Sequence, residues 1–132
     1  MAHLVPGVWA MGARRYEDLQ AWQLTNESKR EVYALIATPP AATDIKFCHQ
    51  IRESAASSPR NISEGFGRFR PAVFAHFLEI AIGSLMETQN SLRDGVDRGY
   101  FTAERIAPAN RLAERSIQVS VKLLLYLKRH RR

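Results

Sequence analysis

The sequence predicts an all-α protein, an antiparallel up-and-down four-helix bundle. Proline and glycine residues break the chain at four places, and each of the four segments between them is long enough for a helix. Apolar residues recur in these segments at spacings of three and four, and no segment shows the alternation typical of a strand. Four long helices joined by short loops favour antiparallel neighbours, and therefore a bundle.

The first two predicted helices cover the N-terminal half. The first runs from about Tyr16 to Ala37 and has a polar middle, so we expect it to be the least deeply packed. The second begins at Thr43 or Asp44, either of which can cap a helix. Gly65 is expected to end it in the left-handed conformation, and Pro59 to kink or split it. Its apolar side has spacings of four, four, three and four: Phe47, Ile51, Ala55, Ser58 and Ile62.

The third and fourth predicted helices cover the C-terminal half. The third runs from Pro71, a residue tolerated in a first turn, to about Arg98. The fourth follows Thr102, a good cap, and runs to about Arg129. The inward stripe of the third is Phe74, Phe77, Ala81, Leu85, Thr88 and Leu92, and that of the fourth is Ile106, Ala109, Ala113, Ile117, Val121, Leu124 and Leu127.

Four apolar residues lie off these stripes and indicate a second buried face. We predict that they form a subunit interface, and a wider monomer core is an equally good interpretation for any one of them. The four residues are Ile80, Ile82, Leu123 and Leu125.

The predicted domain covers residues 14–132 and follows a flexible extension, residues 1–13. Pro6 and Gly7 interrupt this extension, which lacks the basic start and apolar centre of a signal peptide. No run approaches the roughly 20 apolar residues of a membrane span. The single cysteine, Cys48, excludes an internal disulfide and fits a reducing compartment. A cytoplasmic protein without a membrane partner is expected.

The charge predicts an anionic partner. Nineteen Lys and Arg against 13 Asp and Glu give a net charge of +6. In an up-and-down bundle, the starts of the first and third helices and the ends of the second and fourth lie at one pole. We call this end the basic pole. The only acidic residues predicted there are Glu17, Asp18 and Glu64. Its candidate nucleic-acid-binding residues are Arg14, Arg15, Arg60, Arg68, Arg70, Lys128, Arg129, Arg131 and Arg132.

Two features of the basic pole leave alternatives open. Residues 128–132 are equally well interpreted as a solvated tail. Phe66 and Phe69 can stack on nucleic-acid bases, although burial over the end of the core is the favoured role.

The motifs of common enzymes and metal sites are missing from the sequence. His76 and Glu79 have the reverse order of a di-iron motif, and no second copy follows. Cys48 and His49 are adjacent, so on a helix they point about 100° apart. Gly65-Phe66-Gly67 follows a helix and lacks the Lys-Ser/Thr ending of a phosphate loop. No catalytic residue, metal or cofactor is therefore expected, and the protein is not expected to be an enzyme.

Four strings carry a family resemblance: residues 16–23 (YEDLQAWQ), residues 50–52 (QIR), residues 58–65 (SPRNISEG) and residues 77–87 (FLEIAIGSLME). Together they resemble the bacterial four-helix-bundle family of 23S rRNA intervening-sequence proteins, over nearly the whole chain. The resemblance implies a ring-like homopentamer without enzymatic activity. It also implies a relationship to the basic accessory proteins of diversity-generating retroelements, which bind nucleic acid and partner a reverse transcriptase.

Two functions follow as hypotheses. The favoured one is an oligomeric module that binds RNA or DNA through phosphates, with little sequence specificity. The alternative is a protein adaptor whose basic surface docks an acidic partner such as a reverse transcriptase.

Overall fold

The computed structural model describes residues 12–130, and over these residues the chain is an all-α four-helix bundle. Residues 1–11, with most of the predicted extension, and Arg131 and Arg132 lie outside the described part. The elements in chain order are η1 (Tyr16–Asp18), α2 (Gln20–Ile36), η2 (Ala41–Thr43), α3 (Ile45–Phe66), α4 (Pro71–Asp97) and α5 (Ala103–Arg129).

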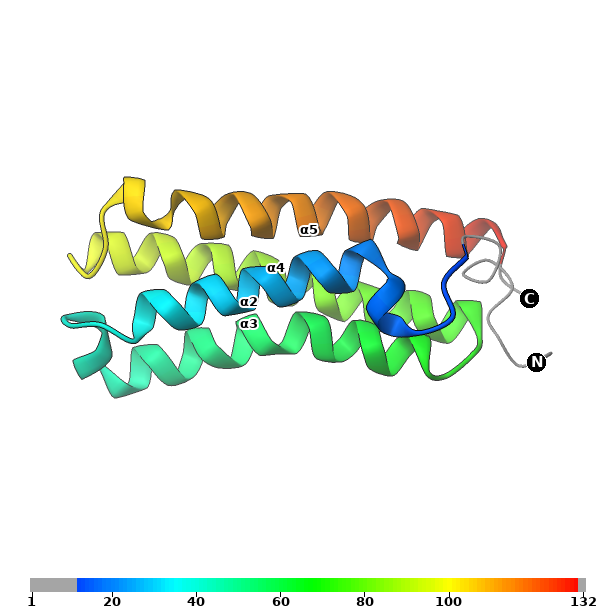
Figure 1. Cartoon of the computed structure of the whole chain (residues 1–132), viewed down its shortest axis with the longest axis horizontal. Helices are drawn as coiled ribbons and strands as arrows, with labels where there is room; N and C mark the ends of the chain where they lie inside the picture. The colour runs from blue at the N-terminus through cyan, green and yellow to red at the C-terminus, as the bar shows by residue number, and fades with distance from the viewer. Residues whose placement is uncertain (1–11, 131–132) are drawn as a thin grey trace.

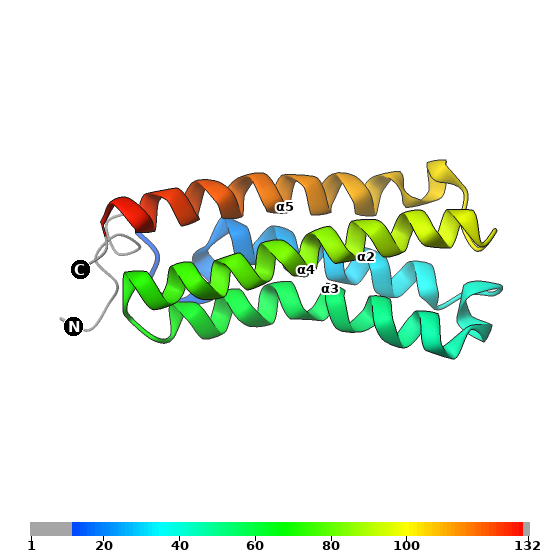
Figure 2. The same ribbon diagram turned by 180° about the vertical axis from the view of Figure 1, so that it is seen from behind.

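The long helices pack in an up-and-down order. Each packs against the next along the chain, and α5 returns to pack against α2. Figure 1 shows the helices running antiparallel, and Figure 2 shows α3 and α4 side by side from the other face. The predicted fold class is confirmed.

Two helix starts have side-chain caps that the sequence predicts. The Asp44 carboxylate accepts a hydrogen bond from the Phe47 N–H at 3.0 Å, and the Thr102 hydroxyl accepts one from the Arg105 N–H at 3.1 Å. Each cap satisfies a backbone donor that has no partner inside the helix.

Of the two effects predicted for Pro59, a kink or a split, the split is wrong, because α3 is continuous through this residue. Proline lacks the N–H that would bond to the carbonyl of residue 55. The Ser58 hydroxyl donates to that Ala55 carbonyl instead, at 3.3 Å. A neighbouring side chain therefore satisfies the acceptor that the proline leaves.

Gly65 does not end α3, which corrects the second prediction for this helix. The helix continues to Phe66, and Gly65 is buried within it. A Cβ at Gly65 would lie 2.7 Å from Phe77 Cβ and 2.8 Å from Phe74 Cδ1. The glycine is there because α4 approaches the backbone of α3 at this point, and the left-handed residue of the loop is Phe69, with φ 58°.

The inward face of α5 also differs from the predicted stripe. Val121 is 36% exposed, whereas Leu123 is buried in the core with Ala21, Leu78 and Leu127. The buried face passes through two serines, Ser116 and Ser120. Steps of four residues from Ala113 through Ile117 to Val121 each advance about 40° around a helix, so the apolar pattern drifts off the core.

Candidate nucleic-acid interface

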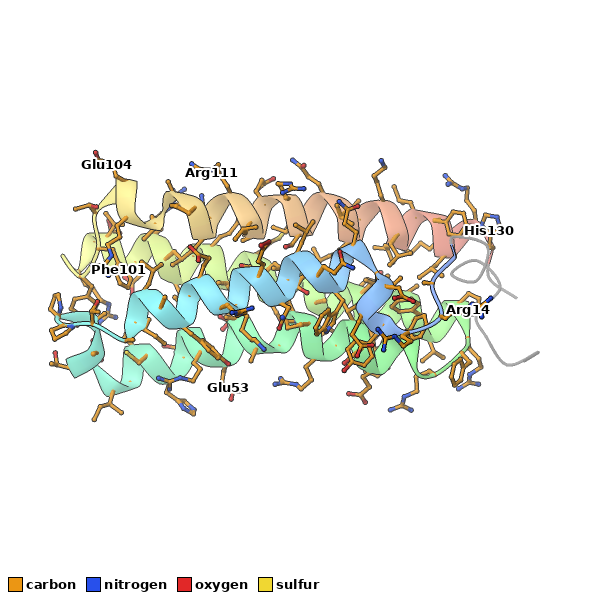
Figure 3. The ribbon with its side chains drawn as sticks, in the orientation of Figure 1. Arg14, Glu53, Phe101, Glu104, Arg111 and His130 are labelled. Atoms are coloured by element: carbon orange, nitrogen blue, oxygen red, sulfur yellow. The ribbon has the colours of Figure 1, made fainter. Side chains whose placement is uncertain are left out.

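The chain segments of the predicted basic pole lie together in the structure. The segment before α2, the end of α3, the start of α4 and the end of α5 meet at one end of the bundle (Figure 1). Arg14 and His130, from opposite ends of the described chain, both lie there (Figure 3). Its described basic residues are Arg14, Arg15, Arg60, Arg68, Arg70, Lys128 and Arg129, all of them exposed.

Asp18 and Glu17 contact Arg14 and Arg15. One Asp18 carboxylate oxygen accepts the backbone N–H groups of Arg14 and Arg15 at 3.1 and 3.2 Å. These bonds, first the one from Arg14, hold the pKa of the Asp18 carboxyl below its ordinary value of 3.8. The Arg15 guanidinium also lies 4.0 Å from the Glu17 carboxylate.

Two further carboxylates form ion pairs with cations of the basic pole. Arg68 pairs with Glu64 at 2.9 Å, and its guanidinium lies 5.4 Å from the centre of the Phe77 ring. Lys128 pairs with Glu79 of α4 at 3.5 Å. The sequence does not place Glu79 at this pole, because the level at which α4 packs against α5 depends on tertiary structure.

The remaining cations carry the excess charge. Arg60, Arg70 and Arg129 are exposed, and none of them pairs with a carboxylate within the described residues. An unpaired exposed cation binds a phosphate without first giving up a protein partner. These three arginines are therefore the strongest phosphate-binding candidates of the basic pole.

The loop between α3 and α4 separates the two aromatic residues of the pole. Phe66 is 6% exposed and packs in the core, as expected, whereas Phe69 is 42% exposed between Arg68 and Arg70. The centre of the Phe69 ring lies 6.5 Å from the centre of the Phe66 ring. The favoured burial of Phe69 is thus wrong, and its ring is accessible for stacking on a base.

Sequence reasoning missed a row of cations on α5, which we call the α5 stripe: Arg111, Arg115, Lys122 and Arg129. All four are exposed, and Figure 3 shows Arg111 pointing away from the bundle. Their spacings of four, seven and seven keep them on one side of a helix. This periodicity is visible in the sequence, but the basic pole is defined by the ends of the helices and does not include the middle of α5.

The four predicted interface residues divide in the structure. Ile80 and Leu125 are 40% and 52% exposed, which leaves them available to a partner. Ile82 is half-buried against the small core cluster of Leu85, Ala113 and Ile117. Leu123 is 5% exposed and belongs to the chain's own core, so its assignment to an interface is corrected.

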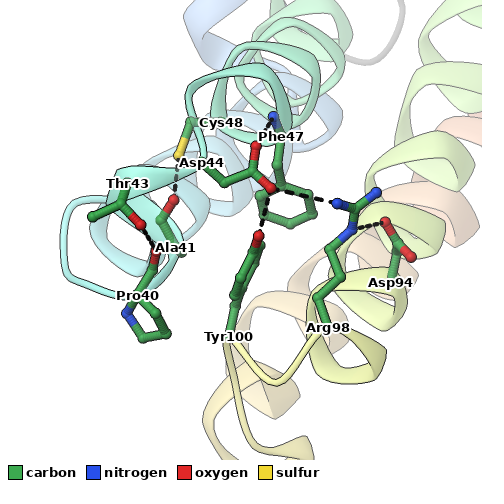
Figure 4. Close-up of polar contacts among 9 residues, drawn as sticks. All are labelled: Pro40, Ala41, Thr43, Asp44, Phe47, Cys48, Asp94, Arg98 and Tyr100. Atoms are coloured by element: carbon green, nitrogen blue, oxygen red, sulfur yellow. Dashed lines mark hydrogen bonds and ion pairs between the residues drawn. The ribbon is translucent and has the colours of Figure 1, made fainter.

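A polar network closes the opposite pole (Figure 4). Asp44 accepts a hydrogen bond from the Tyr100 hydroxyl and lies 3.4 Å from Arg98, which also pairs with Asp94 at 2.7 Å. The Tyr100 bond holds the pKa of the Asp44 carboxyl below its ordinary value and raises the pKa of the phenol. The positive charge of Arg98 is therefore compensated by Asp44 and Asp94.

Cys48 and His49 do not form a pair. Cys48 is buried and its thiol donates to the Ala41 carbonyl at 3.1 Å (Figure 4), whereas His49 is exposed. Burial raises the pKa of the Cys48 thiol, which keeps it protonated and unreactive. In the described part of the chain, no three His, Cys, Asp or Glu side chains are placed to hold a metal ion.

No helix among residues 12–130 has the length and apolar character needed to cross a membrane.

Comparison with known proteins identifies the family. No curated protein matches the chain. The model of the family described as 23S rRNA-intervening sequence protein matches residues 17–122, from η1 into the second half of α5. The match covers most of the bundle, and the chain therefore belongs to the 23S rRNA-intervening sequence protein family.

Proposed function

We propose that this protein is a non-enzymatic module that binds RNA or DNA through phosphates at the basic pole. The observation that carries the proposal is the trio Arg60, Arg70 and Arg129, exposed at one end of the bundle without carboxylate partners in the described structure. The family's description, which refers to a ribosomal RNA, favours RNA as the first nucleic acid to test.

The chemistry of the pole suits low sequence specificity. Guanidinium groups bind phosphate oxygens in any sequence, and the exposed Phe69 ring can stack on any base. Self-association would place several poles on one particle, so that weak contacts add by avidity. Ile80 is the proposed contact for such an assembly, for which the homopentamer implied by the resemblance is the proposed form.

The direct test is a fluorescence-polarisation titration of labelled RNA and DNA. The pole variant is Arg60→Gln with Arg70→Gln. The matched control is Arg52→Gln with Arg93→Gln, which removes the same charge from two exposed arginines nearer the opposite end of α3 and α4. We expect the pole variant to bind roughly tenfold more weakly than wild type, and the control less than about threefold.

Absence of binding by the wild-type protein at low salt would exclude this function. The basic pole would then be interpreted as the docking surface of an adaptor for an acidic protein such as a reverse transcriptase. Capture of a partner that survives nuclease treatment would support that interpretation.

A further inference from the structure

One side of α5 carries the α5 stripe, a row of four exposed cations. At about 100° per residue, the four cations of the α5 stripe lie within about 40° of one another around the helix. At about 1.5 Å per residue, the row from Arg111 to Arg129 is about 27 Å long. None of the four pairs with a carboxylate within residues 12–130.

Two grooves between α2 and α5 lie beside this row. One of about 460 Å³ is lined by Lys122, Arg129, Tyr126 and Gln20, among others. A second of about 460 Å³ is lined by Arg115, Arg30, Trp22 and Gln23, among others. Three of the four cations of the stripe, all except Arg111, therefore border grooves that also contain an aromatic ring and a side-chain amide.

This combination matches the chemistry of a single nucleic-acid strand. Phosphates need a row of cations, whereas unpaired bases need a ring face and amide groups that hydrogen-bond to their edges. A duplex presents its phosphates but keeps its bases stacked and paired, so it cannot use the grooves. The row meets the basic pole at Arg129, which belongs to both.

We propose that a single RNA or DNA strand runs along α5, with its phosphates on the α5 stripe and its bases toward the α2–α5 grooves. The proposal rests on the proposed function and names the class of nucleic acid and its path. The strand enters or leaves at the basic pole and follows the helix toward Arg111.

The test compares two triple variants with the same loss of charge. The stripe variant is Arg111→Gln, Arg115→Gln and Lys122→Gln, which leaves the pole's own residues intact. The control is Lys46→Gln, Arg52→Gln and Arg93→Gln, two arginines and one lysine exposed on α3 and α4. On a labelled single strand of about 20 nucleotides, we expect the stripe variant to lose about tenfold or more in affinity, and the control less than about threefold.

Three results would overturn the strand path. One is equal loss in both variants, which would indicate a response to net charge alone. Another is a stripe variant that binds as the wild type does. The third is a duplex of the same length that binds as tightly as the single strand. If wild type binds and the pole variant is weakened in these cases, the proposed function stands and only the path along α5 falls; if wild type binds nothing, both fall.

Trp22 provides a readout of the groove itself. The variant Trp9→Phe leaves Trp22 as the single tryptophan of the chain. Addition of a single strand is expected to change Trp22 emission at the same concentrations at which polarisation reports binding. Binding without any change in that emission would overturn the placement of bases in the groove beside Arg115.

Discussion

The Lys128 ammonium lies 3.5 Å from the Glu79 carboxylate, which shows that these two residues lie at the same level where α4 and α5 pack. Seven residues are close to two helical turns, so a step of seven along each antiparallel helix stays on the same seam. Such a step from Glu79 and Lys128 reaches Met86 and Val121, both exposed apolar residues. The next step reaches Arg93 and Glu114, which line one groove between the two helices.

The ion pair predicts that two adjacent cations contribute differently to binding. Lys128 must leave Glu79 to contact a phosphate, whereas Arg129 has no carboxylate partner in the described structure. Arg129→Ala is expected to reduce the slope of log K against log salt by about 1, and Lys128→Ala by less. Polarisation titrations at four salt concentrations measure both slopes. Equal reductions would show that the ion pair is irrelevant to binding.

Substitutions at Gly65 and Gly83 test the packing of α3 on α4, with Gly83 as the control position. A Cβ at Gly65 meets Phe77 and Phe74 at 2.7 and 2.8 Å, whereas one at Gly83 meets nothing within 4 Å. Gly65→Ala is expected to lower the free energy of unfolding by about 1–3 kcal/mol through overpacking. Gly83→Ala is expected to raise it by about 0.5–1 kcal/mol, because alanine favours the helix. Urea unfolding measures both, and a stable Gly65→Ala variant would contradict the close approach.

Asp44 is expected to make stability depend on acid pH. Its pKa is lowered in the folded state, first by the Tyr100 hydrogen bond and then by the Phe47 N–H. Its contribution is therefore present above the ordinary value of 3.8 and is lost as pH falls through the lower folded-state value. Asp44→Asn should be less stable than wild type at neutral pH, and the difference should shrink in acid.

The control for this measurement is Asp97→Asn, which removes an exposed carboxylate from the same pole. Thermal unfolding at several pH values compares the three proteins. A difference between Asp44→Asn and wild type that stays constant down to pH values well below 3.8 would contradict the role of the charged carboxylate.

Substitution of Phe69 is expected to weaken nucleic-acid binding without lowering the stability of the fold. Its φ of 58° favours glycine, so Phe69→Gly relieves a strained conformation while removing the exposed ring. We expect little change in the urea midpoint and a fall of about tenfold in affinity for unpaired nucleic acid, from the loss of stacking. Phe69→Tyr keeps a ring and should keep the affinity. Unchanged binding by the glycine variant would show that the ring does not touch the ligand.

The sequence predicts the features that local pattern and connectivity determine. It does not predict the level at which two helices pack against each other or the rotation of a helix about its axis. Spacing and breakers identify the four helices, Asp44 and Thr102 identify two caps, and the up-and-down order brings the basic pole together. The sequence does not predict the rotation of α5 about its axis, because the apolar Val121 is exposed and the polar Ser120 is buried. The sequence alone predicts that Gly65 ends the helix. Only the structure shows that Phe77 of α4 lies too close to leave room for a side chain there.

The basic pole shows the same division. The order of the helices along the chain predicts which residues lie at the basic pole. Which of its cations remain unpaired depends on where the carboxylates of neighbouring helices lie in the folded structure. Glu79 reaches Lys128 from another helix, and no sequence pattern links the two. Predicting Arg60 and Arg70 as stronger candidates than Arg68 required the Glu64 ion pair to be seen.

The most direct measurement of the central claim is the salt dependence of binding between the wild-type protein and a labelled RNA. If Arg60, Arg70 and Arg129 each neutralise a phosphate, log K falls linearly with log salt, with a slope of about −2 to −3 or steeper. A slope near zero, or no binding at the lowest salt concentration, would contradict a nucleic-acid module that works through phosphates.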